Sequence, residues 1–263
     1  MIKEVFKPAS LAEAVKLKSE NIYYLSGGTQ INWAPAKTAR LLEGKPAIEK
    51  VILVQDILSR EIKKEGEALV IGAGITLQDL IDADKIPEVL KKAAGFIASR
   101  SIRNMATLGG NIAANRPDSY IIPCLMALKA EVKTADADIM SVEKYITEER
   151  AELILEIILP RVEGVCLIDV ALKSSGAYPS VTSAVRISDK EAVVVLGCVS
   201  DHVIRLKEIE PGIMDDSLSG DTLVAAVSNM INPKSDLLGT TAYKKYISGS
   251  MVAHLVALSR EGV

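Results

Sequence analysis

Runs of apolar residues separated by polar turns predict one helix and two strands at the start of the chain. Ser10 and Glu13 form a capping box, in which each side chain satisfies a free amide of a helix that continues to about Lys18. The run Ile22–Leu25 is typical of a short buried strand, and it ends at a pair of glycines. Residues 51–54 form a second run of the same kind.

The middle of the chain alternates between strand and helix patterns. Glu65 and Gly66 predict the turn of a hairpin, and Thr76 predicts the N-cap of a helix that begins at Leu77. Apolar spacing predicts further helices at 90–98 and 120–128, and strands at 68–71, 131–134 and 153–158. The sequence Gly72-Ala-Gly74 is a truncated G-x-G-x-x-G motif without its third glycine, so we interpret it as a strand-to-helix turn rather than a Rossmann site.

The last hundred residues have a different pattern. Segments 166–172, 181–187 and 192–198 are rich in β-branched residues and are separated by turn residues, which predicts a three-stranded antiparallel sheet. Helices at 221–232 and 241–259 are expected to cover one face of this sheet. We therefore predict an α+β protein with units at 1–55, 56–162 and 163–263.

Two glycine pairs are the main chemical signal. One lies in Ser26-Gly27-Gly28-Thr29-Gln30, and the other in Thr107-Leu108-Gly109-Gly110-Asn111. A loop that wraps a diphosphate brings backbone N–H groups close to phosphate oxygens, where a Cβ would stand in the way. A single glycine pair is also typical of a tight turn, but two pairs with similar flanks favour a diphosphate cofactor held by two loops. Arg100 and Arg103 precede the second pair, either as cations for the diphosphate or as a solvated basic turn.

Charge and composition narrow the class of protein. The 263 residues carry a formal charge of −3, with 49% hydrophobic residues. An acidic balance argues against a nucleic-acid binder, which needs a basic face. The N-terminus has no apolar signal segment, and no run approaches the length of a membrane span, so a cytoplasmic protein is expected.

Cysteine and histidine offer little for metal or acid–base chemistry. Cys124, Cys166 and Cys198 are widely spaced in apolar surroundings, which predicts buried thiols rather than ligands or disulfides. With only His202 and His254 besides, we expect no iron–sulfur or zinc site and no general acid, base or nucleophile.

Several motifs together resemble one protein family. The segments Ser26-Gly-Gly-Thr29, Ile71-Gly-Ala-Gly74, Ile102-Arg-Asn-Met-Ala-Thr-Leu-Gly-Gly-Asn111 and Tyr243-Lys-Lys-Tyr246 occur in the order seen in FAD-binding medium subunits of molybdenum hydroxylases. The chain is thus similar, nearly end to end, to the flavoprotein subunits of xanthine dehydrogenase and carbon monoxide dehydrogenase.

The resemblance implies a two-lobed FAD-binding fold of the vanillyl-alcohol oxidase type, followed by a small α+β domain, with FAD bound noncovalently. The residues that would bind FAD are Ser26, Gly27, Gly28, Thr29, Gln30, Ile31, Thr107, Gly109, Gly110, Asn111, Ser119 and Lys173. Two positions depart from the family: Tyr120 stands where an aspartate aligns, and Gln30 where an aspartate is common. FAD is then expected to bind differently or more weakly, or to be stacked on or shielded by Tyr120.

The resemblance also implies an electron relay. A molybdopterin-binding large subunit would oxidise an organic substrate, an iron–sulfur small subunit would carry single electrons, and FAD in this chain would pass them to NAD or another acceptor. Two alternatives remain: a self-sufficient FAD and NADPH reductase of the same fold, similar to the enolpyruvyl reductase of cell-wall synthesis, and an assembly scaffold that has lost FAD.

Overall fold

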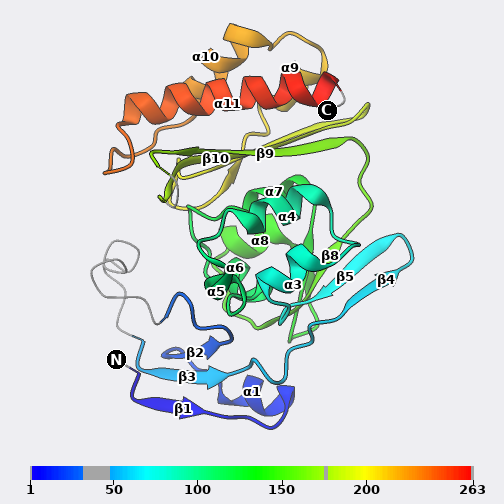
Figure 1. Cartoon of the computed structure of the whole chain (residues 1–263), viewed down its shortest axis with the longest axis vertical. Coiled ribbons are helices and arrows are strands. Elements are labelled where there is room, and N and C mark those ends of the chain that lie inside the picture. Colours follow the sequence, from blue (N-terminus) through cyan, green and yellow to red (C-terminus); the bar gives the residue numbers. More distant parts are fainter. Residues whose placement is uncertain (1, 32–47, 175–176, 262–263) are drawn as a thin grey trace.

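Three sheets stack along the long axis of the molecule, each with its own helices (Figure 1). The computed structural model describes residues 2–31, 48–174 and 177–261. The sheet nearest the N-terminus has three strands, the middle sheet has five and the C-terminal sheet has four. We refer to the unit around the first sheet as lobe 1 and to the unit around the middle sheet as lobe 2.

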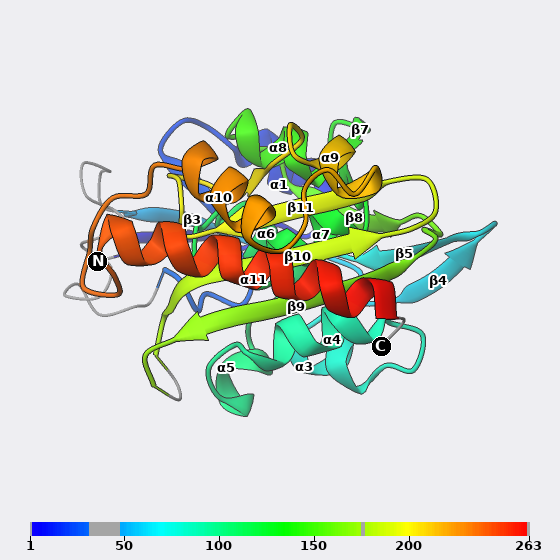
Figure 2. The ribbon, with the colours of Figure 1, turned by 90° about the horizontal axis from the view of Figure 1, so that it is seen from above.

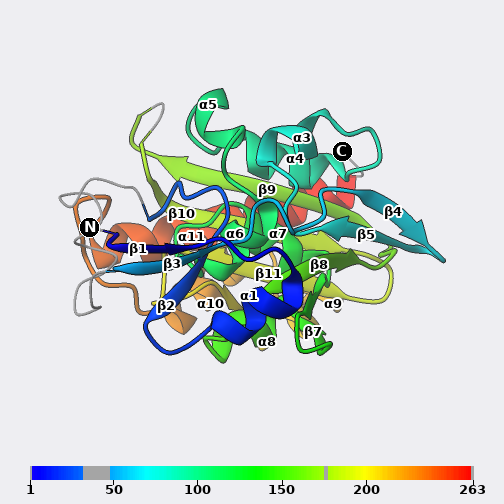
Figure 3. The same ribbon diagram turned by 90° about the horizontal axis from the view of Figure 1, so that it is seen from below.

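In its described residues, lobe 1 is a small parallel sheet with α1 (Leu11–Leu17) packed beside it, as the view from below shows (Figure 3). Its strands lie in the order β1-β3-β2. Ser10 accepts a hydrogen bond from the Glu13 amide at 3.2 Å and so caps the helix as predicted. The elements of this lobe are β1 (Glu4–Phe6), α1 (Leu11–Leu17), β2 (Ile22–Leu25) and β3 (Lys50–Leu53).

Lobe 2 is an antiparallel sheet in the order β4-β5-β8-β6-β7 with helices packed on it. Its strands are β4 (Ile62–Glu65), β5 (Ala68–Gly72), β6 (Glu131–Thr134), β7 (Ile139–Ser141) and β8 (Ile154–Leu159). Its helices are α3 (Leu77–Asp82), α4 (Glu88–Gly95), α5 (Arg100–Arg103), α6 (Leu108–Ala113), α7 (Ile121–Ala127) and α8 (Val142–Thr147). Every residue of α7 is buried, so this helix is the centre of the lobe.

The turn between β5 and α3 is structural, as the truncated glycine motif suggested. A Cβ on Gly72 would overlap the backbone carbonyl of Ser59, and one on Gly74 would come within 2.8 Å of the Leu58 carbonyl oxygen. The two glycines therefore allow close backbone packing. Thr76 then caps α3 through a 3.1 Å bond from the Asp79 amide, as predicted.

The C-terminal sheet has four strands within the described residues, where three were predicted. The strands are β9 (Val165–Leu172), β10 (Pro179–Ile187), β11 (Ala192–Gly197) and β12 (Ile204–Arg205), in the order β12-β11-β10-β9. The helices are α9 (Glu210–Met214), α10 (Gly220–Met230) and α11 (Thr241–Glu261). The strand β12 was missed because two residues are too few to show a periodicity.

This sheet is covered on both faces. Seen from above, α10 and α11 run across one face (Figure 2), where Val194 and Leu196 join the cluster that contains Val227 and Val252. Their neighbour Val195 lies in the core of lobe 2. Alternation along β11 thus joins the C-terminal domain to lobe 2. Among the described residues, no helix combines the length and the apolar run that a bilayer crossing requires.

Candidate cofactor-binding site

The two glycine-containing segments are far apart in the sequence but touch in the fold. A Cβ on Gly27 would overlap the backbone carbonyl oxygen of Met105 and lie 3.2 Å from the Cα of Ala106. Gly27 follows β2 in lobe 1, whereas Met105 and Ala106 lead into α6 in lobe 2. The glycine is therefore required for backbone-to-backbone contact between the lobes.

The first segment, residues 26–31, leaves its backbone donors available. Within the described part of the chain, the N–H groups of residues 27–31 have no hydrogen-bond acceptor. Gly28 has a φ of 67°, a left-handed conformation in which glycine is favoured. The Ser26 hydroxyl is buried and also lacks a partner. Because buried or clustered polar groups are normally paired, this loop has the donor set of an anion-binding site.

The second segment has a different structure from the expected loop. Thr107 is the N-cap of α6, and both Gly109 and Gly110 lie in the first turn of that helix. The amide of Gly109 donates to the Ala73 carbonyl at 3.0 Å, and that of Gly110 donates to the Thr107 hydroxyl at 3.2 Å. The amides of Leu108 and Asn111 are also paired, with Ile75 and Thr107 respectively.

Gly109 has a packing role as well. An added Cβ would lie 2.6 Å from the Cβ of Ala73, because α6 rests directly on the chain that follows β5. Gly110 is exposed, and an added Cβ would meet only the Thr107 hydroxyl, at 2.8 Å. Gly109 thus lets α6 pack against its neighbour, while the amides of both glycines are already paired within the protein.

Asn111 and Ser119 form a pair beside α6. The Ser119 hydroxyl accepts from the amides of Ile121 and Ile122 at the start of α7, so its own hydrogen is directed to the Asn111 Oδ1, 3.0 Å away. Because the Oδ1 of Asn111 accepts this bond, its NH₂ group remains as the side-chain donor of the second segment. Ser119 is 5% exposed and therefore acts through Asn111.

An ion pair that sequence reasoning missed connects the first segment to residues that follow α6. Arg116 donates two parallel bonds to Asp118, of 2.7 and 2.5 Å, and a third to the Gln30 Oε1 at 2.8 Å. The Arg116 guanidinium also lies 5.8 Å from the centre of the Tyr178 ring. The signal available in the sequence was Arg116-Pro-Asp118, in which a proline fixes a turn between opposite charges.

Three other candidate residues pair with protein groups. Arg103 donates to Gln78 at 3.0 Å and to the Ile97 carbonyl at 3.1 Å, and exposed Arg100 lies 3.9 Å from Asp82. Of the two alternatives for these arginines, their contacts do not favour cations directed at the diphosphate. Exposed Lys173 donates to the Leu237 carbonyl at 2.6 Å, and its role toward FAD stays a prediction.

Tyr120 is packed against protein. Its ring centre lies 5.6 Å from that of Phe96, and it joins the apolar cluster of lobe 2. Burial, with a smaller effect of Asp118, raises the pKa of Tyr120 to about 12. The hydroxyl therefore stays protonated near neutral pH. Burial also raises the pKa of Tyr178, although the nearby Arg116 opposes the shift.

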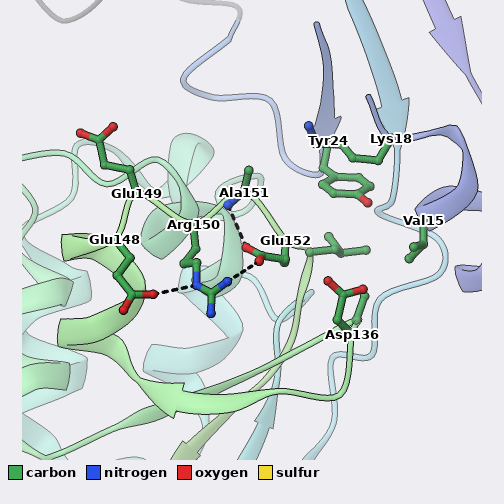
Figure 4. Close-up of a pocket in the computed structure, with 11 residues that line it drawn as sticks. Val15, Lys18, Tyr24, Asp136, Glu148, Glu149, Arg150, Ala151 and Glu152 are labelled. Atoms are coloured by element: carbon green, nitrogen blue, oxygen red, sulfur yellow. Dashed lines mark hydrogen bonds and ion pairs between the residues drawn. The ribbon is translucent and has the colours of Figure 1, made fainter. Parts of the chain in front are cut away.

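A cavity of about 430 Å³ opens between lobe 1 and lobe 2 (Figure 4). Tyr24 and Asp136 point into it, and burial together with Asp136 raises the pKa of Tyr24. On the opposite wall Arg150 is held between Glu148, at 3.0 Å, and Glu152, at 2.8 Å. The glycine segments do not line this cavity, but Tyr24 precedes Ser26 by two residues.

Comparisons with known proteins agree with a flavin site. Residues 1–162 match the family described as "FAD binding domain in molybdopterin dehydrogenase". The chain is 34% identical over 261 residues to YgfM, an uncharacterized protein of Escherichia coli (strain K12), covering 98% of this chain and 96% of the relative. It is 26% identical over 275 residues to the carbon monoxide dehydrogenase medium chain of Hydrogenophaga pseudoflava, covering 95% and 94%.

A solved structure shows the same fold. Carbon monoxide dehydrogenase from Hydrogenophaga pseudoflava, in a form that lacks the Mo-pyranopterin moiety, superposes with a TM-score of 0.84. The match has 22% sequence identity and covers 99% of this chain and 98% of the other. The likeness extends through the C-terminal sheet and helices, beyond the residues that the family match covers.

Proposed function

Since this chain belongs to the family of FAD-binding domains in molybdopterin dehydrogenases, we propose that it is the electron-transfer flavoprotein subunit of a molybdenum hydroxylase complex. Residues 1–162 are an FAD-binding domain, and the chain is a member of an oxidoreductase family. The proposal adds the direction of electron flow: from iron–sulfur clusters of a partner, through FAD, to NAD or another acceptor.

The observation that carries the proposal is the set of unpaired donors in residues 26–31. Five consecutive N–H groups and the buried Ser26 hydroxyl lack acceptors within the described part of the chain. A diphosphate supplies the oxygens that such a cradle needs, and bonds to charged groups are worth about 1.5 to 3 kcal/mol each. Asn111 adds a side-chain donor from the second segment.

The cavity between the lobes fits the adenosine end of FAD. Tyr24 lies in β2, which ends at Leu25, directly before the segment that contains Ser26. A diphosphate at residues 26–31 would then place its adenosine toward Tyr24, whose ring offers a stacking surface. Acidic and carbonyl oxygens around the cavity supply acceptors for an exocyclic amine.

Bound FAD supplies the redox chemistry, because a flavin exchanges either one or two electrons. The residues of this chain bind and orient the cofactor and exclude water from it. No described side chain in the site is arranged as a nucleophile or as a general base with an orienting partner. Cys198 makes a weak contact with the Pro179 carbonyl at 3.4 Å, and burial raises the pKa of its thiol, so noncovalent binding is expected.

The complex that we propose contains a molybdopterin-binding large subunit and an iron–sulfur small subunit. The carbon monoxide dehydrogenase relative is a medium chain, which supports the same place for this chain. Within the described residues, no group of three or more histidine, cysteine or acidic side chains could hold a metal ion. In the proposed complex, electrons reach the flavin from the iron–sulfur subunit.

The test is to purify the chain with its native partners and to identify them, while measuring flavin content. We expect one FAD per chain, released intact by acid, and copurification of molybdopterin and iron–sulfur proteins. The Gly28→Val variant should bind FAD over a hundredfold more weakly, because loss of two bonds to the diphosphate costs on the order of 3 kcal/mol.

Three results would contradict the proposal. A purified chain that takes up no FAD would favour a scaffold. Turnover of an enolpyruvyl substrate with NADPH by the chain alone would favour a self-sufficient reductase. Wild-type FAD affinity in a folded Gly28→Val variant would place the diphosphate elsewhere.

A further inference from the structure

We propose that Arg116 is a positioning residue that clamps the FAD-binding loop through Gln30. The inference rests on the proposed FAD site at residues 26–31. It assigns to the Gln30–Arg116–Asp118 cluster the task of holding this loop in its binding conformation before the cofactor arrives.

The contacts of the cluster connect a loop to a rigid support. Gln30 lies in the loop itself, and its Oε1 accepts from Arg116 at 2.8 Å. Within the described residues, the backbone N–H groups of residues 27–31 make no bonds that would fix the loop. The side chain of Gln30 is thus a polar attachment of the loop to lobe 2.

The support beneath Arg116 is well fixed. The carbonyl of Pro117 accepts from the Cys198 amide at 2.7 Å, and the carbonyl of Ser119 accepts from the Thr182 hydroxyl at 3.4 Å. Both donors belong to the C-terminal domain. Residues 116–119 thus lie between lobe 2 and the end of β11, and Arg116 projects from this anchored segment to the loop of lobe 1.

The geometry requires arginine rather than a generic cation. Two nitrogens of the planar guanidinium bind both oxygens of Asp118, while the third binds Gln30. The side chains of Arg116 and Asp118 are 13% and 16% exposed, so the pair is largely shielded from water. A lysine would keep the charge but could not hold the carboxylate bidentately and reach the amide as well.

The functional gain is preorganisation. A loop whose N–H groups already face one site loses less conformational freedom when a diphosphate binds. In this arrangement Asp118 neutralises Arg116, and Gln30 transmits the position of the arginine to the loop without adding charge. Breaking the contact of Arg116 with Gln30 or with Asp118 should loosen the loop and weaken FAD binding, while leaving the rest of the fold in place.

The experiment compares two breaking variants with a matched control in the full-length chain. Arg116→Lys and Gln30→Leu each remove the contact to the loop. Arg205→Lys makes the same change at another bidentate pair, in which Arg205 binds Glu210 at 2.7 Å with side chains 20% and 10% exposed. Backbone ¹⁵N order parameters of residues 26–31 in the apoprotein and the FAD dissociation constant are measured for each variant.

We expect both breaking variants to have lower order parameters at residues 27–31 than the wild type and to bind FAD at least tenfold more weakly. Arg205→Lys should lower stability without either effect. The double variant should bind FAD within about threefold of the single variants, because both changes break one interaction. Gln30→Glu, which keeps an acceptor for Arg116, should retain the wild-type order parameters of the loop.

Unchanged order parameters of the loop in Arg116→Lys and Gln30→Leu would overturn the inference, whatever the cofactor. Equal losses of FAD affinity in Arg205→Lys would also overturn it, because the effect would then be general destabilisation. If the wild-type chain binds no FAD, the proposed function fails, and the order parameters still decide whether Arg116 clamps the loop.

Discussion

The Cα of Gly27 packs directly on the backbone carbonyl of Met105, leaving no room for a side chain at position 27. This contact joins the loop after β2 to the segment that leads into α6. It brings together two parts of the chain that sequence reasoning could recognise only separately. The relative position of the lobes, and with it the site between them, therefore depends on one glycine.

Gly27→Ala should destabilise the protein and separate the two segments. The new Cβ would overlap a backbone oxygen, which cannot move as a flexible side chain can, and overpacking of this kind typically costs about 1 to 3 kcal/mol. Urea unfolding measures the effect. Gly95→Ala is the control, because a Cβ there has nothing within 4 Å, so its stability should be unchanged or slightly raised. Equal stabilities of the two variants would contradict the packing argument.

Tyr24→Ala should weaken binding of FAD but not of FMN, which has no adenosine. Loss of a stacking surface is worth about 0.5 to 1.5 kcal/mol, or roughly two- to twelvefold in affinity. Titrations of the apoprotein with each flavin check this. The effect of Tyr24→Phe on FAD affinity should be small. A parallel loss of FAD and FMN affinity would show that the cavity of Figure 4 does not receive the adenosine.

Tyr120→Asp should destabilise the chain even though the family resemblance places an aspartate at this position. Tyr120 packs its ring near Phe96 in the core of lobe 2, and removal of a buried aromatic ring typically costs about 3 to 5 kcal/mol. Tyr120→Phe should stay within about 1 kcal/mol of the wild type and keep its FAD affinity. Thermal unfolding with and without FAD separates the two effects. A stable Tyr120→Asp protein with tighter FAD binding would refute this prediction.

The cysteine thiols should be unreactive in the native protein. They should also make the free energy of unfolding fall as the pH becomes alkaline. Burial raises the pKa of Cys166 to about 12 and also raises those of Cys124 and Cys198. Below the unfolded pKa near 8.5 the thiols are protonated in both states, so the folded state keeps its full stability. As the pH rises from there toward the folded pKa, the thiols ionise only in the unfolded state, and the free energy of unfolding falls.

The loss should approach about 1.4 kcal/mol per pH unit for each buried thiol. Unfolding by urea at pH 8.5 and 9.5 measures it, below the range in which tyrosines titrate. Cys166→Ala should flatten the slope. A disulfide-exchange reagent at pH 8 should label the thiols in urea but not in buffer, and rapid labelling of the native protein would contradict their burial.

Local signals predicted the elements that the structure confirms. The capped helix at Ser10, the strand Ile22–Leu25 and the Thr76 cap depend on neighbouring residues, so the sequence was sufficient. Gly109 and Gly110 were expected in a loop because a glycine loop can bring backbone N–H groups close to a diphosphate. They are helical because Gly109 packs against Ala73, a contact with a distant segment. The vanillyl-alcohol oxidase-type lobes and the unit boundaries at 55 and 162 stay predictions.

The site was predictable only in part for the same reason. A glycine pair could be identified as an anion loop, but which N–H groups remain available depends on partners elsewhere in the fold. Likewise, the separation of Gln30 and Arg116 in the sequence gives no indication that their side chains meet. The direction of Arg103 toward Gln78 was also hidden, because a basic turn looks the same whether it faces a ligand or the protein.

The core of lobe 1 contains a residue that the ribosome makes long after the rest of that lobe. Ala14, Ile52 and Val54 pack with Leu153, which precedes β8 and belongs to lobe 2. A nascent chain therefore cannot complete lobe 1 while only its first strands have emerged. The loop at residues 26–31 gains its final surroundings only after the chain has returned from lobe 2. Synthesis that stops before Leu153 should leave a fragment that cannot retain the cofactor, so incomplete chains would not sequester flavin in the cell.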